Sequence, residues 1–404
     1  MSYSTQQDIL DFVEDNNVKF VRFAFCDIFG TQKNIAVLAS NLSKALEEGV
    51  CFDGSSIAGF MHVEESDLVL RPDLSTVTIL PWRPTEGRVM QFFCDVEKPD
   101  GATFSGNCRG FLRDMNRKFK KLGLTCNVGT ECEFYLFEKD DRGRPTCIPI
   151  DFGGYFDVAP LDAGENLRRD ICLTMEQMGL APQHSHHESG FGQNEVDFMY
   201  STALKSADNL NTFKSTVKAI ADRNGLFASF MPKPLPDWDG SGMHINISAK
   251  GDGGRDLLPA VMAGILEKCA EITLFLNPCE ESYRRLGHDK APRYVTWSDE
   301  NRSQLIRVPA AVGEQRRAEL RSADVTANPY LAYALLIYAG LYGIEKGLVL
   351  PPASDINLYT APAEILQTLQ ALPGSLEEAA ALAATSAFVR EHLPDSVLSA
   401  FSGR

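Results

Sequence analysis

The sequence predicts an α+β protein with two domains, a small β-rich one over residues 1–105 and a large one over residues 106–404. Three observations lead to this. A chain of 404 residues is long for a single domain. Short segments of alternating apolar and polar residues, typical of strands, dominate the first hundred residues. Beyond residue 105, longer helical patterns alternate with further strand-like segments.

The elements of the first domain follow in order. Residues 1–17 form an acidic amphipathic pattern, which predicts a surface helix and not a secretion signal. Residues 18–25 alternate as a strand, and turn-forming residues at 27–30 lead to a second strand around 34–38. Further strand-like segments lie at 77–80 and 88–95, and PDG at 99–101 predicts a turn. We place the domain boundary shortly after this turn.

The second domain begins with a helical pattern over residues 108–122. Residues 127–137 and 243–248 then alternate as strands. The longest apolar stretch, residues 331–344, is shorter than the roughly 20 residues needed to cross a bilayer. We therefore expect a buried helix there, and no membrane partner.

Charge and cysteine content narrow the class of protein. The net charge of −15 argues against nucleic acid or an anionic membrane as the main partner. It does not oppose an anionic substrate, because a local arginine cluster can reverse the field within a cleft. The ten cysteines are scattered without a Cys-x-x-Cys pair, which is typical of reduced thiols and predicts a cytoplasmic protein.

Two glutamates, Glu131 and Glu133, lie one residue apart in the strand-like segment 127–137. Residues i and i+2 of a strand point to the same face, so both carboxylates should lie about 6–7 Å apart on one side. Two such charges repel unless a cation or a proton lies between them. The pair therefore suggests half of a divalent-metal site.

Three later segments carry charged or metal-binding side chains in a similar way: ESGFGQNE at 188–195, HINIS at 244–248 and RAELR at 317–321. The resulting candidate metal ligands are Glu131, Glu133, Glu188, Glu195, His244 and Glu319. Five carboxylates and one imidazole suit Mg²⁺ or Mn²⁺, and six ligands suggest two or more ions. Paired divalent ions most often act on a phosphoryl group. Arginines that could neutralise phosphate oxygens and a substrate carboxylate are Arg302, Arg307, Arg317 and Arg321.

Each segment alone has a simpler explanation. A Glu-x-Glu strand is usually a solvated face, a single histidine usually belongs to the core, and RAELR resembles a surface ion-pair ladder. Four such segments in one chain are hard to explain in that way. A zinc hydrolase is a further alternative, because histidines stand at 184, 186 and 187, but their spacing lacks the helical i, i+4 pair.

Taken in order, these segments resemble the glutamine synthetase family. The resemblance extends to about residue 330, and further motifs that carry it are FDGSSI at 52–57, GGYF at 153–156, MPKP at 231–234, GSGMH at 240–244, NRS at 301–303, IRVP at 306–309 and ANPYL at 327–331. It implies a β-grasp-like N-terminal domain and a catalytic domain whose curved antiparallel sheet is flanked by helices. It also implies a ring-based homo-oligomer, often a dodecamer, with active sites between subunits.

The family's reaction has two steps. ATP, a co-substrate, phosphorylates the γ-carboxylate of glutamate, and ammonia then displaces phosphate to form an amide. The chemistry agrees with the residues, since metals and arginines spread charge in both steps and a base must take a proton from the amine.

The resemblance implies a role for each candidate residue. It places Glu133, Glu188 and Glu195 on one metal, and Glu131, His244 and Glu319 on the second. The remaining implied roles are amino-acid binding by Gly240, Arg285 and Arg321, phosphate or transition-state contacts by Arg302, Arg307 and Arg317, adenine contacts by Tyr200 and Ser248, and ammonium binding and deprotonation by Asp53, Ser56 and Tyr155. Asp53 lies in the N-terminal domain, which in this family reaches into the neighbouring subunit's active site.

Three departures from the family pattern lie near the substrate end. Lys290 stands where a flap glutamate is expected, Asp239 replaces an asparagine, and Asn246 replaces a second histidine. We therefore keep two alternatives to glutamine formation. One is a γ-glutamyl amide synthetase that uses a small primary amine or a polyamine. The other is a catalytically silent structural or regulatory relative, against which the complete carboxylate set argues.

Overall fold

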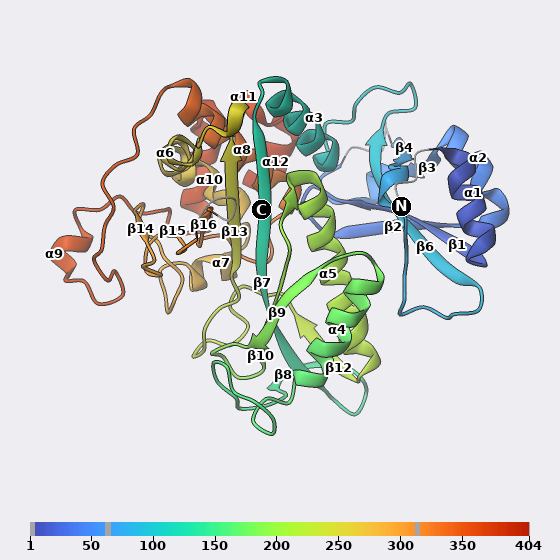
Figure 1. The fold of residues 1–404 in the computed structure, drawn as a ribbon, viewed down its shortest axis with the longest axis horizontal. Helices are drawn as coiled ribbons and strands as arrows, with labels where there is room; N and C mark the ends of the chain where they lie inside the picture. Colours follow the sequence, from blue (N-terminus) through green and yellow to red (C-terminus); the bar gives the residue numbers. More distant parts are fainter. Residues whose placement is uncertain (1–4, 61–65, 312–315, 404) are drawn as a thin grey trace.

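The computed structural model describes residues 5–60, 66–311 and 316–403. Within them, an N-terminal six-stranded sheet is followed by a ten-stranded sheet with most of the helices. The predicted α+β class is therefore confirmed. Figure 1 shows the N-terminal domain at one side of the molecule and the long strand β7 running through the middle of the second domain.

The N-terminal domain packs two helices against its sheet. Its elements are α1 (Gln6–Asp15), β1 (Val18–Cys26), β2 (Gln32–Leu38), α2 (Leu42–Glu48), β3 (Val50–Asp53), β4 (Asp67–Pro72), β5 (Thr78–Ile79) and β6 (Arg88–Glu97). The strand order is β2-β1-β6-β4-β3, with β5 beside β6. Strands β1 and β6 are parallel neighbours at the centre, and their inward residues Phe23 and Phe92 are fully buried. The first four residues of the predicted N-terminal helix lie outside the described residues.

The second domain begins with helix α3 and is built on strand β7. Its strands are β7 (Thr125–Lys139), β8 (Pro145–Pro149), β9 (Pro182–His187), β10 (Gln193–Phe198), β11 (Ser201–Thr202), β12 (Leu226–Ser229), β13 (Met243–Lys250), β14 (Trp297–Asp299), β15 (Ile306–Val308) and β16 (Ala318–Leu320). Its helices are α3 (Cys108–Lys121), α4 (Glu165–Gln177), α5 (Ala203–Arg223), α6 (Leu258–Leu276), α7 (Glu280–Arg285), α8 (Pro329–Glu345), α9 (Ala363–Leu366), α10 (Leu376–Thr385), α11 (Ala387–His392) and α12 (Asp395–Ser402).

Strand β7 organises the large sheet because it is long enough to pair with several strands along its length. The main order is β14-β15-β16-β13-β7-β10-β9, and β8, β11 and β12 pair with other parts of β7. Strands β13 and β10 are its antiparallel neighbours on opposite sides. Side chains from three adjacent strands therefore meet on one face of the sheet.

The apolar stretch predicted to be buried forms α8, which packs along α6. Close approach of the two helices depends on glycine. A Cβ added at Gly264 would lie 2.0 Å from the carbonyl oxygen of Ala339, and one at Gly343 would lie 2.1 Å from that of Ala260. Among the described helices, none has the length and apolar character needed to cross a membrane.

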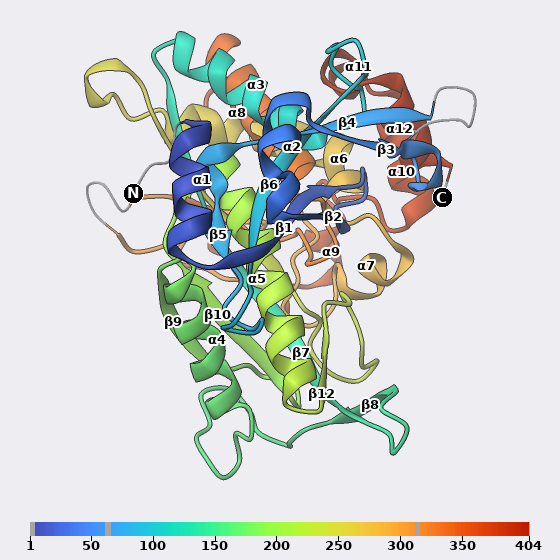
Figure 2. The ribbon, with the colours of Figure 1, turned by 90° about the vertical axis from the view of Figure 1, so that its right-hand side faces the viewer.

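Buried polar contacts join the two domains, which Figure 2 shows from the N-terminal side. Arg109 on α3 binds Asp208 on α5 at 2.8 Å and Asp73 of the N-terminal domain at 2.8 Å. The side-chain amide of Asn328, at the start of α8, donates to the carbonyl oxygen of Ile28 at 2.8 Å. These contacts fix the N-terminal domain against helices of the second domain.

Candidate active site

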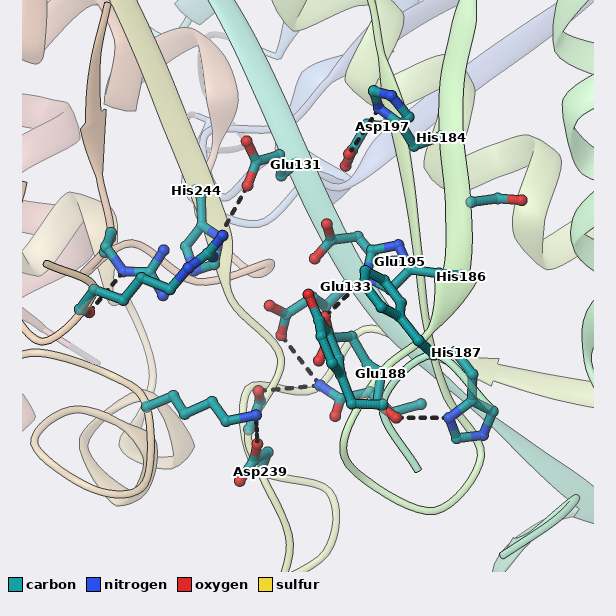
Figure 3. Close-up of a pocket in the computed structure, with 18 of the residues that line it drawn as sticks. Glu131, Glu133, His184, His186, His187, Glu188, Glu195, Asp197, Asp239 and His244 are labelled. Carbon is teal, nitrogen blue, oxygen red and sulfur yellow. Dashed lines mark hydrogen bonds and ion pairs between the residues drawn. The ribbon is translucent and has the colours of Figure 1, made fainter. Parts of the chain in front are cut away.

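A cavity of about 1370 Å³ opens beside the sheet face that carries the predicted carboxylates. Strands β7, β9, β10 and β13 supply one wall. The rest of the lining comes from α4, from Arg285 at the end of α7, from the segments around residues 155–158, 239–240, 288–291 and 302–309, and from Arg317, Arg321 and Tyr359. Figure 3 shows acidic and imidazole side chains from several strands pointing into this space.

The first acidic group joins three strands. In the sheet, His244 of β13 lies opposite Glu131 of β7, and Asn246 lies opposite Glu319 of β16. The Nδ1 atom of His244 is 3.3 Å from an oxygen of Glu131 and 3.7 Å from one of Glu319. Burial raises the pKa of Glu131, but hydrogen bonds from His244 and Asn246 outweigh it and hold the pKa at about 2. Glu131 is therefore an anion at neutral pH.

The second acidic group lies one strand further. Glu195 of β10 is opposite Glu133 of β7, and Glu133 accepts hydrogen bonds from the backbone N–H of Gly242 at 2.8 Å and the amide of Gln193 at 3.1 Å. Burial, then neighbouring carboxylates, raise the pKa of Glu195 well above its ordinary value. Burial also raises the pKa of Glu133. Like charges are thus concentrated where water is scarce.

The carboxylates and histidines form sets of three whose ligand atoms lie close enough together to bind one divalent ion. Possible ligand atoms lie within 4.8 Å of one another in three sets at this site: Glu131, His244 and Glu319; Glu133, Glu195 and His244; and His186, Glu188 and Glu195. The donors are mostly carboxylate oxygens, which suit Mg²⁺ or Mn²⁺ better than a structural zinc. The residues therefore fit two or more such ions, because buried carboxylates that repel one another are stabilised by a cation.

Arginine side chains surround the first group. Glu319 is fully buried between Arg321, which contacts it directly, and Arg307, whose Nη1 atom lies 2.6 Å away. Arg317 instead donates from Nε to the side-chain oxygen of Asn246 at 2.9 Å, and Asn246 donates to Glu131 at 2.9 Å. Arg307 reaches Glu319 from the neighbouring strand β15, on which it lies opposite Glu319.

Arg285 lies deeper in the wall. It donates to the backbone oxygens of Ser322 at 2.8 Å and Arg321 at 3.3 Å, and burial lowers its pKa. The Cβ of any side chain at Gly240 would lie 2.7 Å from Arg285, so glycine leaves the room in which this arginine sits.

The two charged departures from the family pattern meet at the mouth of the cavity. The Nζ atom of Lys290 lies 3.0 Å from an oxygen of Asp239. Asp289, next to Lys290, does not turn into the cavity but pairs with Lys233.

Most of the predicted site residues line this one cavity. They are Glu131, Glu133, Tyr155, Glu188, Glu195, Gly240, His244, Arg285, Arg302, Arg307, Arg317 and Arg321. Glu319 lies directly behind them, in contact with Arg307 and Arg321. Four predicted residues do not line it: Asp53, Ser56, Tyr200 and Ser248. Asp53 is exposed on the N-terminal domain and accepts hydrogen bonds from the hydroxyls of Ser55 and Ser56.

Sequence reasoning missed several residues around the second acidic group. His186 lies 3.0 Å from Glu188, and Gln193 binds Glu133. The buried ring of His187 donates to the carbonyl oxygen of Glu188 at 2.6 Å and binds Asp151 at 2.9 Å, which fixes the start of the loop. The histidines at 184, 186 and 187 are the sequence feature that marks this region, but their spacing lacks the helical zinc motif and so did not point to a role beside the carboxylates.

Comparison with known proteins gives consistent matches over the whole chain. The family model for the glutamine synthetase β-grasp domain matches residues 17–99, and that for the glutamine synthetase catalytic domain matches residues 105–403. A glutamine synthetase of Clostridium saccharobutylicum is 46% identical over 413 residues, covering 98% of this chain and 93% of that protein. One of Staphylococcus epidermidis is 45% identical over 389 residues, covering 92% and 87%.

Solved structures agree. A structure described as a GmaS/ADP complex matches with a TM-score of 0.89 and 28% identity, covering 98% of this chain and 94% of that one. The glutamine synthetase of Plasmodium falciparum matches with a TM-score of 0.87 over 100% of this chain and 95% of that one, and at 21% identity this likeness concerns the fold.

Proposed function

Because this chain belongs to the glutamine synthetase family, we propose that the acidic cavity is where it joins ammonia to glutamate at the expense of ATP. The product of this family's reaction, and of this chain, is glutamine. The observation that carries the assignment to this cavity is the set of buried carboxylates on adjacent strands, which converge on a space large enough for a nucleotide and an amino acid together.

The carboxylates hold two or more Mg²⁺ or Mn²⁺ ions. Glu133, Glu188 and Glu195 form one ligand set, and Glu131, His244 and Glu319 form the other. When bound, such ions neutralise and polarise the phosphoryl group. Meanwhile the chain's own residues set the ligand geometry: Gly242 and Gln193 fix the carboxylate of Glu133, and Arg307 and Arg321 fix that of Glu319.

The arginines bind the anionic groups of the substrates. Arg302, Arg307 and Arg317 contact phosphate oxygens and offset the charge that develops during transfer. Arg285 and Arg321 bind the carboxylates of glutamate, with Gly240 giving close approach to the backbone. Tyr200 and Ser248 contact the adenine of ATP, from a part of the sheet beyond the lining of the cavity.

Ammonia is bound and deprotonated by Tyr155 together with Asp53 and Ser56. Hydrogen bonds from Ser55 and then Ser56 lower the pKa of Asp53, which keeps it anionic and able to attract ammonium. In the single chain Asp53 lies outside the cavity lining, and this supports a site that a neighbouring subunit completes. We therefore propose a ring-based homo-oligomer, such as a dodecamer.

All ten cysteines are free. Together with a reaction that consumes ATP and glutamate, this supports a cytoplasmic location.

The test is phosphate release from ATP with glutamate and Mg²⁺, comparing ammonium with methylamine, ethanolamine and putrescine. Stimulation by ammonium with glutamine as product supports the proposal. Stimulation by an organic amine, with ammonium weak, would instead indicate a γ-glutamyl amide synthetase. Phosphate release that is the same with and without every amine would contradict both.

A further inference from the structure

The side-chain ammonium of Lys290 lies among groups that recognise an ammonium ion. Its Nζ atom is 3.0 Å from a carboxylate oxygen of Asp239, donates to the hydroxyl of Ser189, and lies 5.6 Å from the ring centroid of Tyr155. A carboxylate, a hydroxyl and an aromatic face together would bind a free ammonium in the same way. Figure 3 shows Asp239 and its dashed contact below the carboxylates of the cavity.

The surrounding charges hold Lys290 in its protonated form. Burial alone lowers the pKa of Lys290, but the hydrogen bond and charge of Asp239, followed by the charges of Glu188 and Glu133, outweigh it and raise the pKa. The lysine therefore lies within reach of the electrostatic field of the acidic groups. An ammonium ion that replaced the Nζ group would meet the same carboxylate of Asp239.

The ion pair is nevertheless easy to open. The side chain of Lys290 is 57% exposed and that of Asp239 is 24% exposed, so solvent screens their attraction. The backbone of the loop is fixed separately, because the hydroxyl of Tyr359 lies 2.9 Å from the carbonyl oxygens of both Lys290 and Arg302, and its single proton is shared between these two acceptors. The lysine side chain can thus turn outward while its loop stays in place.

We propose that Lys290 is a specificity-determining residue, a tethered ammonium that occupies the acceptor position and must turn away before the acceptor enters. This rests on the proposed function. A small ammonium ion replaces the Nζ group on Asp239 and Tyr155. A longer alkylammonium also needs the space that the lysine's methylene chain fills, so Lys290 favours ammonia over primary alkylamines.

The chemistry of the acceptor step is the same for either amine. The neutral amine nitrogen bonds to the γ-carbonyl carbon of the acyl phosphate. The carbon–oxygen bond to phosphate breaks, its electron pair leaves with phosphate, and the new amide nitrogen loses one proton to the released phosphate. Lys290 acts before this step, by deciding which amine reaches the carbonyl carbon.

The test replaces Lys290 by alanine. In wild type, the ammonium group of Lys290 competes with free ammonium for the acceptor position. Because its ion pair with Asp239 is weak and screened by solvent, the lysine fills that position only part of the time. Lys290→Ala should therefore lower the KM for ammonium about two- to fivefold. The kcat and the KM values for glutamate and ATP should change less than about twofold on the same grounds. Propylamine and butylamine should become acceptors, giving γ-glutamyl alkylamides that mass spectrometry detects.

Two matched variants serve as controls. Lys290→Arg keeps a cation beside Asp239 and should therefore not lower the KM for ammonium as Lys290→Ala does. Asp289→Asn breaks the other ion pair of the same loop, to Lys233, and changes no residue that lines the cavity. Asp289 has a φ of +50°, a conformation that asparagine tolerates, so this variant should fold and behave as wild type.

Failure of the inference is separable from failure of the proposed function. If wild type makes glutamine but Lys290→Ala shows an unchanged or higher KM for ammonium and no alkylamide, the inference is wrong. If wild type makes no glutamine, the proposed function fails. A second readout needs no turnover: butylammonium chloride should raise the Tm of Lys290→Ala but not of wild type, and equal shifts in both would also refute the inference.

Discussion

Glu133 and Glu319 should have opposite effects on the stability of the metal-free protein, although both are proposed to hold metal. Glu319 is fully buried between two guanidinium groups. Glu133 is buried among other carboxylates. Replacing each by glutamine keeps the volume and removes one negative charge. The sign of the effect therefore depends on the charge of the neighbours.

The magnitudes follow from these surroundings. Glu319→Gln leaves Arg321 and Arg307 without their anion, and breaking a buried ion pair in this way costs about 3 kcal/mol at the low end of such cases. For Glu133, a carboxylate within 4.8 Å repels it by about 3.5 kcal/mol at an effective dielectric near 20. Its two hydrogen bonds weaken by about 1 kcal/mol each when the acceptor becomes neutral. The net effect of Glu133→Gln is about 1–2 kcal/mol of added stability.

Thermal unfolding in EDTA measures both effects. At about 2 °C per kcal/mol for a large domain, Glu319→Gln should lower the Tm by about 6 °C and Glu133→Gln should raise it by about 2–4 °C. Glu138→Gln is the control, because Glu138 is an exposed glutamate on the same strand. Both test variants should lose at least about 100-fold in phosphate release, as removal of groups that support a metal does, and should lose the stabilisation that Mn²⁺ gives wild type. A fall in Tm for Glu133→Gln as large as that for Glu319→Gln would refute the reasoning.

Other contacts give three further predictions. Asp208→Asn should destabilise the protein by about 3 kcal/mol, because it removes the carboxylate that accepts two hydrogen bonds from buried Arg109. A Tm within 1–2 °C of wild type, taken as about the error of the measurement, would contradict this. Burial raises the pKa of Asp73, but Arg109 and Ser75 outweigh this effect and leave the pKa below its ordinary value. The contribution of Asp73 to stability is therefore present at neutral pH and is lost as the pH falls through the pKa of the folded state. The stability difference between wild type and Asp73→Asn should therefore shrink on acidification below about pH 4, and a constant difference would be inconsistent with it. Burial also raises the pKa of Cys108 to about 12 whereas Cys147 is exposed, so iodoacetamide at pH 8 should alkylate Cys147 in the native protein and Cys108 only after unfolding, as peptide mass spectrometry would show.

Local sequence could predict the part of the site whose geometry follows from the two-residue period of a single strand. Glu131 and Glu133 point into the same cavity because they are two residues apart on β7. The pairing of His244 with Glu131 depends on β13 lying beside β7 in one particular register. No local pattern carries that register, and although the residue types marked both as candidate ligands, only the family resemblance assigned them to the same metal.

Contacts between distant segments were beyond local reasoning. Arg307 binds Glu319 because β15 and β16 pair with these residues opposite each other, and nothing in the RAELR segment itself indicates this partner. In the N-terminal domain, prediction missed α2, β3 and β4. Strand β4 is a short and mostly buried segment, so it shows none of the alternation by which half-buried strands are identified.

Lys290 and Asp239, the two charged departures from the family pattern, belong together because their side chains form one ion pair. Lys290 taken alone would repel ammonium, and Asp239 taken alone would add an unpaired carboxylate at the mouth of the cavity. Because the two side chains pair, each offsets the charge of the other, and the acidic groups behind them keep their attraction for a cation. Ammonia ligation is therefore compatible with a lysine at this position. The pair also implies that neither residue can be reverted alone without effect: Asp239→Asn should raise the KM for ammonium, because it removes the carboxylate on which an ammonium ion would replace the Nζ group of Lys290.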